Sequence, residues 1–305
     1  MITKTKVYTK NTEGNPNIVF QNMGGCIRPE LYMGKGNSLS MITDRYAEID
    51  HVLHYIRQNL HEPVHLSKLA SRAGYSPYHF TRVFKERTGL SPLYYVSSLR
   101  LQKAKDLLLH THLSIRDIAL EIGQQSLGTF TSRFTSRVGL TPSQFRNSTI
   151  DADLHLRSLQ QVGESSQTLT FSTAYGVVEG TVVTDHPFQG IILLGLFAKP
   201  IPEGLPLHGT LLFSLGRFRL TGVRPGTYYL MATSVSWGSK AVDVLLPHHT
   251  LRTRSREPVV VRPYEPVPEQ KVTLYPPRFD DPPILISLPL LMQNYLSKSL
   301  NYSNR

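Results

Sequence analysis

The sequence predicts a multidomain protein, in which an all-α domain of paired helix–turn–helix units is followed by an antiparallel β-sandwich. Three observations predict this. One residue pattern occurs twice between residues 65 and 146, and the positive charge is concentrated in the same part. From Phe171 onward, short β-branched and aromatic runs are separated by Gly and Pro. A chain of 305 residues is long enough for two or three domains.

The two copies of the pattern share their spacing. In each copy an Ala is followed four residues later by a Gly. A first Phe is then followed by a second Phe, a Gly and a Pro, at steps of four, five and three residues. The copies consist of Ala70, Gly74, Phe80, Phe84, Gly89 and Pro92, and of Ala119, Gly123, Phe130, Phe134, Gly139 and Pro142. This spacing predicts two copies of one supersecondary unit.

Each copy is typical of two helices joined by a short turn. A short helix ends at the first Gly, which suits the left-handed conformation of a C-terminal cap. The second helix places its two Phe residues one turn apart on a buried face. Ser76–Pro77 and Ser91–Pro92 are helix-start signals, because a capping hydroxyl precedes a ring already fixed at helical φ. A long helix over residues 92–110 is therefore expected to join the two units.

The segments GYSPYHFTRVFKERTGLSP, RLQKAKDLLL, SIRDIALEIG and FTSRFTSRVGLTPSQFR together resemble the paired helix-turn-helix DNA-binding domain of the AraC family of bacterial transcription regulators. The resemblance covers residues 44–148. It implies that the two second helices lie about one DNA turn apart and enter successive major-groove segments of double-stranded DNA. We therefore expect a sequence-specific DNA-binding transcription regulator.

The charge distribution is consistent with a DNA partner. Residues 45–148 hold fourteen Lys and Arg against seven Asp and Glu, whereas residues 149–305 hold fourteen against twelve. A small basic domain suits a phosphate backbone. The charge distribution alone favours a solubilising surface over a DNA partner. Charge and repeat together favour DNA.

In the first unit, burial of Phe80 and Phe84 leaves the opposite side of the helix for DNA. Arg82 is the best candidate for a base contact, because its planar guanidinium can pair with guanine through two hydrogen bonds. Lys85 and Arg87 are expected at phosphates or in solvent. The predicted DNA contacts of this unit are Ser76, Tyr78, His79, Thr81, Arg82 and Lys85, of which the family resemblance points to Tyr78, Thr81 and Arg82.

The second unit departs from the family pattern. Gln124 replaces the usual aromatic residue, and Ser132 stands where a basic residue is common. Gly128 inside the helix costs up to about 1 kcal/mol relative to Ala. We therefore expect this unit to read fewer bases and to bind more phosphate. Its predicted DNA contacts are Ser126, Thr129, Ser132, Arg133 and Arg137.

The flanking segments have simpler predictions. Residues 1–43 are expected to be a mobile arm in which residues 17–20 are a candidate strand. An amphipathic helix over residues 44–60 is expected to pack on the first unit. Residues 149–170 are predicted as a linker that includes a short helix at 153–161. The single cysteine, Cys26, excludes an internal disulfide framework and fits a cytoplasmic protein.

Residues 171–246 are predicted to form the sandwich and to fold by themselves. The candidate strands are residues 175–183, 190–198, 209–214, 217–220 and 227–234. GTVVTD, IILLGLF and GRFRLTGVRPGTYYLMA resemble the prealbumin-type sandwich of carboxypeptidase regulatory domains. Residues 247–305 are predicted as a Pro-rich tail with a terminal strand and helix. Within it, Asp280–Asp281 is favoured as a solvated loop over a cation site, and His248–His249 as an exposed turn.

No catalytic constellation, metal-ligand spacing or cofactor motif is evident, so neither an enzyme nor a metal or cofactor site is expected. No membrane partner is expected. Two hypotheses remain. In the first, the chain regulates transcription and its sandwich binds a small-molecule or protein effector. In the second, the sandwich is a carbohydrate- or peptide-binding module that the helical domain tethers to DNA. A homodimer is left open.

Overall fold

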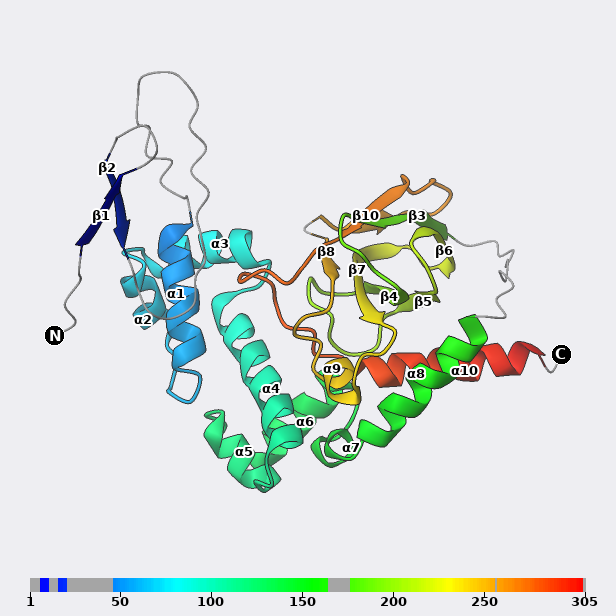
Figure 1. Ribbon diagram of the computed structural model, residues 1–305, viewed down its shortest axis with the longest axis horizontal. Coiled ribbons are helices and arrows are strands. Elements are labelled where there is room, and N and C mark those ends of the chain that lie inside the picture. Colours follow the sequence, from blue (N-terminus) through cyan, green and yellow to red (C-terminus); the bar gives the residue numbers. More distant parts are fainter. Residues whose placement is uncertain (1–5, 11–15, 21–45, 164–175, 256, 304–305) are drawn as a thin grey trace, which may run out of the picture. The chain divides into compact units, whose positions relative to one another are not determined.

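The computed structural model describes residues 6–10, 16–20, 46–163, 176–255 and 257–303 (Figure 1). Residues 1–43 and 44–305 form two separate units. In the first, β1 (Lys6–Lys10) pairs antiparallel with β2 (Pro16–Phe20). The candidate strand at 17–20 is therefore confirmed, and it has a partner that was not predicted. Cys26 lies outside the described residues.

The helical domain begins with α1 (Ala47–Gln58), α2 (Leu66–Arg72), α3 (Pro77–Thr88), α4 (Pro92–His110), α5 (Ile115–Glu121), α6 (Leu127–Val138) and α7 (Pro142–Arg146). The first helix–turn–helix unit is α2 and α3, the second is α5 and α6, and α4 joins them as predicted. Both α3 and α6 end at a glycine with positive φ, Gly89 at 79° and Gly139 at 87°. The two Phe residues of each helix are fully buried in one core.

Helix α8 (Thr149–Gly163) occupies most of the segment that was predicted as a linker. It includes the short helix expected at 153–161 and extends it at both ends. Ala152 is buried in the core of the helical domain, whereas Leu159 is buried in a second cluster with β-strand residues. The linker prediction is therefore wrong for these residues, because the apolar side of α8 has two surfaces to pack against.

The strands are β3 (Gly176–Thr184), β4 (Gly190–Phe197), β5 (His208–Leu212), β6 (Gly216–Val223), β7 (Gly226–Ser236), β8 (Arg252–Arg254), β9 (Val259–Val261) and β10 (Gln270–Leu274). One sheet has the order β10-β3-β6 and the other the order β5-β4-β7-β8, with β9 also paired to β7. The two sheets share one buried core, to which Val178, Ile192, Phe218 and Leu230 contribute.

The predicted boundary at residue 246 is wrong. Strands β8, β9 and β10 come from the predicted tail, and α10 (Leu288–Ser303) ends it, whereas α9 (Ala241–Leu245) comes before it. Strand β10 pairs parallel with β3, with Val272 opposite Val182, so the sheets are not purely antiparallel. Parallel strands need a long crossover connection, so their pairing leaves no short turn signal in the sequence.

The core of the helical domain includes side chains from the second half of the chain. Ile201, Leu245, Leu246 and Leu285 belong to the same buried cluster as the helical Phe residues. Burial of one such side chain contributes about 1.5–3 kcal/mol. This shared core argues against the prediction that the β-strand region folds by itself. None of the helices in the described ranges is long and apolar enough to cross a membrane.

Lys105 on α4 is fully buried where the helical domain meets the tail. Its ammonium group donates hydrogen bonds to the carbonyl oxygens of Ile284 at 3.2 Å and Leu285 at 3.3 Å, and lies 5.3 Å from the centre of the Phe145 ring. Burial lowers the pKa of Lys105 to about 7, against a smaller opposite effect of Asp106. The helical domain therefore contains a lysine that folding has deprived of most of its hydration.

We predict that Lys105→Met stabilises the protein at pH 7, and that this gain shrinks as the pH rises to 10. In the unfolded chain a lysine titrates at about 10.4, so protons stabilise the unfolded state between pH 7 and that value. The wild type therefore gains stability with rising pH over this interval, whereas the variant does not. Thermal unfolding at several pH values measures this, with the exposed Lys103→Met as control. An equal gain at pH 7 and pH 10 would contradict the prediction.

Candidate nucleic-acid interface

Helix α3 is fixed at both ends by its own sequence. The Ser76 hydroxyl accepts a hydrogen bond from the backbone N–H of His79 at 3.3 Å, and Pro77 provides the first turn. Gly89 closes the helix in the left-handed conformation. Between these ends, Phe80 and Phe84 face the core with no exposed surface. The remaining side of the helix is consequently held in a defined orientation toward solvent.

That side carries the residues predicted to contact DNA. Tyr78 is 84% exposed, Arg82 and Lys85 are also exposed, and His79 and Thr81 are half-buried. An Arg82 guanidinium nitrogen lies 3.4 Å from Nδ1 of His79. The structure therefore places Tyr78, Thr81 and Arg82 on one helix where each is accessible.

Helix α6 repeats this construction with smaller side chains. The Ser126 hydroxyl accepts hydrogen bonds from the Thr129 backbone N–H at 3.3 Å and from the Thr129 hydroxyl at 3.1 Å. Ser126, Thr129, Ser132 and Arg133 are exposed, as the sequence predicted. In place of the Tyr78 and Arg82 of α3, this helix presents Gly128 and Ser132.

The buried position of Arg137 contradicts its prediction as a DNA contact. This residue is only 8% exposed, and its guanidinium pairs with Glu203 and donates hydrogen bonds to Ser98 at 2.6 Å and Ser97 at 3.2 Å. It also lies 4.5 Å from the centre of the Tyr94 ring. A guanidinium held in this way is not free to bind a phosphate. The partner Glu203 lies 66 residues away in the chain, so no local pattern could reveal it.

One candidate residue was missed. Thr131 follows Phe130 directly, as Thr81 follows Phe80, and both threonines are half-buried. Superposing the two copies on their first Phe would have identified it. Thr131 is therefore the residue of α6 that corresponds to a predicted reading position of α3.

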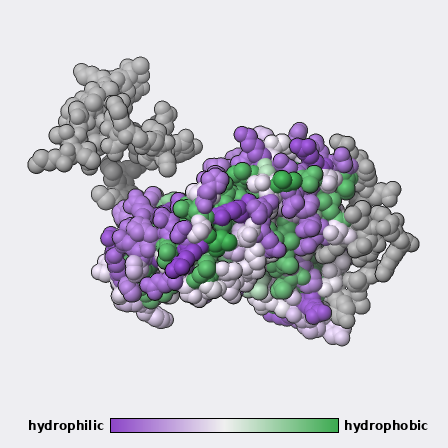
Figure 2. Space-filling model, turned by 90° about the horizontal axis from the view of Figure 1, so that it is seen from below, coloured by the Kyte–Doolittle hydropathy of each residue, from purple (hydrophilic) through white to green (hydrophobic). Residues whose placement is uncertain are grey.

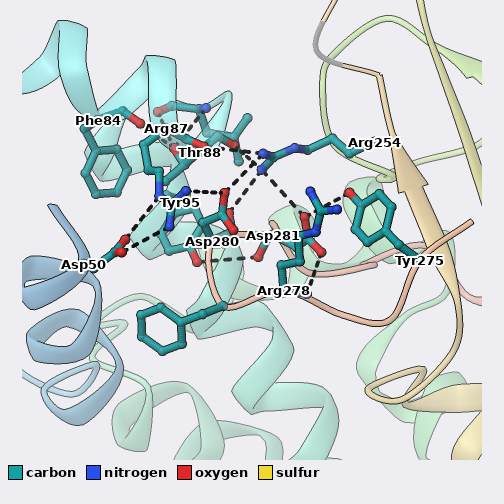
Figure 3. A network of polar contacts seen from close by, with 12 residues as sticks. Asp50, Phe84, Arg87, Thr88, Tyr95, Arg254, Tyr275, Arg278, Asp280 and Asp281 are labelled. Carbon is teal, nitrogen blue, oxygen red and sulfur yellow. Dashed lines mark hydrogen bonds and ion pairs between the residues drawn. The ribbon is translucent and has the colours of Figure 1, made fainter. Parts of the chain in front are cut away.

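Arg87 was expected at phosphates or in solvent, and Asp280–Asp281 in a solvated loop. The structure contradicts both expectations. Asp280 and Asp281 are 4% and 6% exposed rather than solvated (Figure 3). Asp280 pairs with Arg254 at 3.4 Å and with Arg87 at 3.7 Å, and Asp281 accepts a hydrogen bond from the Tyr275 hydroxyl at 3.2 Å. Burial raises the pKa of Tyr275 to about 12, with a further contribution from Asp281. These charges connect α3 to the tail, so Arg87 is a structural residue.

His248 is also part of a contact between distant segments. Its ring nitrogens lie 2.8 Å from the Gln102 side chain and 2.8 Å from the Asp106 carboxylate, both on α4. His249 is exposed, as predicted for the turn. The prediction of an exposed turn therefore holds for His249 but not for His248.

Figure 2 shows the surface of the unit of residues 44–305 from below. The end that carries α1 and α2 is largely hydrophilic, whereas hydrophobic residues gather nearer the middle.

We predict that Arg137→Ala lowers the free energy of unfolding by about 3–5 kcal/mol, because Glu203 would be left buried without its partner. Denaturant unfolding of the full chain measures this. The control is Arg133→Ala on the same helix, which is exposed and should change stability by no more than about 0.5 kcal/mol. If both variants were equally stable, the ion pair would not be important for folding.

Comparisons with known proteins agree with this geometry. A family model described as a helix-turn-helix domain matches residues 69–148. The HTH-type transcriptional regulator YobQ of Bacillus subtilis is 33% identical over 127 residues, which are 39% of this chain and 51% of YobQ. The transposon Tn10 TetD protein of Escherichia coli is 34% identical over 119 residues, which are 38% of this chain and 86% of TetD.

Among solved structures, the DNA-binding domain of AdpA in complex with a target DNA is 28% identical, with a TM-score of 0.32 over 33% of this chain and 91% of that one. The chain spans about half the length of YobQ. From its two helix–turn–helix units and these relatives, the chain belongs to the AraC family of DNA-binding transcriptional regulators.

Proposed function

We propose that this regulator recognises specific DNA sequences mainly through α3, while α6 anchors the second half of the site. The observation that supports this most is the exposure of Tyr78 and Arg82, with the half-buried Thr81 between them, on a helix whose opposite face is fixed by two buried Phe residues. A recognition helix held in this way can enter the major groove with little loss of conformational entropy. Arg82 has the length and the two parallel donors needed for guanine O6 and N7.

For α6 we propose a different balance. Its accessible side presents Gly128, Thr129, Ser132 and Arg133, of which only Arg133 is charged. Arg133 is rotated by about 100° around the helix axis from Ser132, the counterpart of Arg82. We therefore assign Arg133 to the phosphate backbone and the hydroxyl groups to weaker contacts.

We predict that Arg82→Ala costs about 1–3 kcal/mol in binding and relaxes the preference at one base pair, whereas Arg133→Ala weakens binding to all sequences about equally. The salt dependence should separate the two. Loss of one phosphate contact reduces the slope of log K against log salt by about 0.9. Selection from a random DNA pool, followed by binding titrations at several salt concentrations, measures both quantities.

Two outcomes would count against this assignment. If Arg133→Ala changed the selected sequence while Arg82→Ala did not, α6 would be the main reader. A salt response close to zero for the wild type would argue against DNA as the partner, because phosphate neutralisation releases counterions.

For residues 176–303 we propose a prealbumin-like sandwich that acts as the effector module of the regulator, which we place in the cytoplasm. The shared core of the two sheets supports a face-to-face arrangement. The contacts with α3, α4 and α6 support regulation over mere tethering, because a tethered module needs no buried contacts with the helices that bind DNA.

A further inference from the structure

The C-terminal end of α3 is held by a side chain from the β-strand region. The guanidinium of Arg254 on β8 donates hydrogen bonds to the carbonyl oxygens of Thr88 at 3.0 Å and Arg87 at 3.3 Å (Figure 3). Arg254 also pairs with the Asp280 carboxylate, which in turn pairs with the Arg87 side chain. The last carbonyl groups of a helix have no partner within the helix, and its negative end favours a cation. The β-strand region therefore caps α3 with a buried positive charge.

The C-terminal end of α6 is held in a similar way. The backbone N–H of Gly204 donates to the Arg137 carbonyl at 2.7 Å, and the backbone N–H of Ser287 donates to the Val138 carbonyl at 2.9 Å. The Arg137 side chain pairs with the carboxylate of Glu203. Here too, segments outside the helical repeat bind the last carbonyl groups of the helix and its final arginine.

The two ends use corresponding positions of the repeat. When Phe80 is placed on Phe130, Arg87 falls on Arg137 and position 88 falls on position 138. In both helices the carbonyl groups of these two positions accept hydrogen bonds from the second half of the chain, and the arginine pairs with an acidic residue of that half. Each proposed DNA-reading helix is therefore attached to the β-strand region at the same point.

The two points of attachment are joined to each other. The contacts come from Arg254 of β8, from a strap (residues 280–288) and from a loop (residues 199–206). The backbone N–H groups at positions 285 and 286 of the strap donate to the Pro202 carbonyl of the loop at 3.0 and 3.1 Å. A series of contacts therefore runs from the end of α3 to the end of α6 without passing through α4, the helix that connects the two units covalently.

We propose that the strap, the loop and Arg254 form a brace that holds α6 in a fixed position relative to α3, and that this preorganisation raises the affinity for DNA long enough to reach both helices. The proposal rests on the proposed DNA-binding function. Arg254, Asp280 and Glu203 are then positioning residues, which act on DNA binding through the two helices.

The physical reason is the effective concentration of the second unit. Once α3 is bound, the gain in affinity from α6 depends on how often α6 is found at its own segment of the duplex. With α4 as the only connection, part of this gain would be lost in ordering the second unit on the DNA. The brace orders that unit during folding, before DNA is present.

The test compares two hairpin-closed duplexes that carry the sequence selected from the random pool by the full chain. A long duplex of about 20 base pairs reaches both helices, whereas a short one of about 10 base pairs contains only the α3 half. The α3 half is the one in which Arg82→Ala relaxes the base preference. Fluorescence anisotropy gives the Kd of the full chain for each duplex, and the quantity compared between variants is the ratio of the two affinities.

Arg254→Gln removes the cap of α3. The affinity for the long duplex should fall at least fivefold, while that for the short duplex stays within twofold of the wild type, because the accessible side of α3 is unchanged. Arg252→Gln is the matched control on the same strand. Arg252 is 8% exposed, and its guanidinium donates to the carbonyl groups of Pro247, His248 and Thr250, which precede β8. This variant should leave the ratio of the two affinities unchanged.

Two further variants separate the brace from a folding defect. Glu203→Gln tests the α6 end and should also lower the ratio at least fivefold. Arg254→Lys keeps the positive charge beside Asp280 and Asp281 but lacks the planar fork of the guanidinium, so it should fold and lower the ratio at least twofold. Circular dichroism and thermal unfolding verify that each variant is folded at the temperature of the binding measurement.

Three results would overturn the proposal. Equal losses for both duplexes in the folded variants would show that the contacts serve stability alone, and an unchanged ratio would show that they do not position α6. A higher ratio would mean that the contacts hold α6 away from DNA. Failure of the proposed function has a different signature, since the wild type itself would then bind the selected and random sequences equally on both duplexes.

Discussion

Burial of residues 280–288 between the helices and the sheets is the contact on which the rest of the structure depends. This segment supplies Leu285 to the core of the helical domain and the carbonyl groups that receive Lys105. It also supplies the carboxylates that neutralise Arg254. A buried backbone without regular pairing is stable only when its polar groups find partners, and here α4, α6 and the loop of residues 199–206 provide them.

Buried charges make this contact specific. Arg137 with Glu203, and Arg254 with Asp280, are held at sites where little water can replace a lost partner. A buried pair contributes little net stability, but the loss of one member costs several kcal/mol, so only one arrangement of the segments satisfies all the charges. The helical domain and the β-strand region are consequently joined as one folding unit, whereas an ordinary linker would leave them independent.

The two helix–turn–helix units share a backbone pattern but not a surface. Both helices bury two Phe residues, start at a capping serine and end at a left-handed glycine. Where α3 carries Tyr78 and Arg82, α6 carries Gly128 and Ser132. A repeated framework with unequal exposed side chains suits a reader that takes most of its sequence information from one half of the site.

The sequence by itself determined the paired units, the bounds of α4 and the accessible side of α3, because these depend on local spacing and capping. It also located the first five strands of the sheets to within a few residues. The roles of Arg137, Arg87, His248 and the Asp280–Asp281 pair were decided only by the tertiary structure. Asp50 lies 37 residues from Arg87, Glu203 lies 66 residues from Arg137, and Asp106 lies 142 residues from His248. Asp280 has a nearer partner in Arg254, 26 residues away, but its pairing with Arg87 on α3 also spans the chain. Burial turned charges that look solvated in the sequence into contacts between the two halves of the chain.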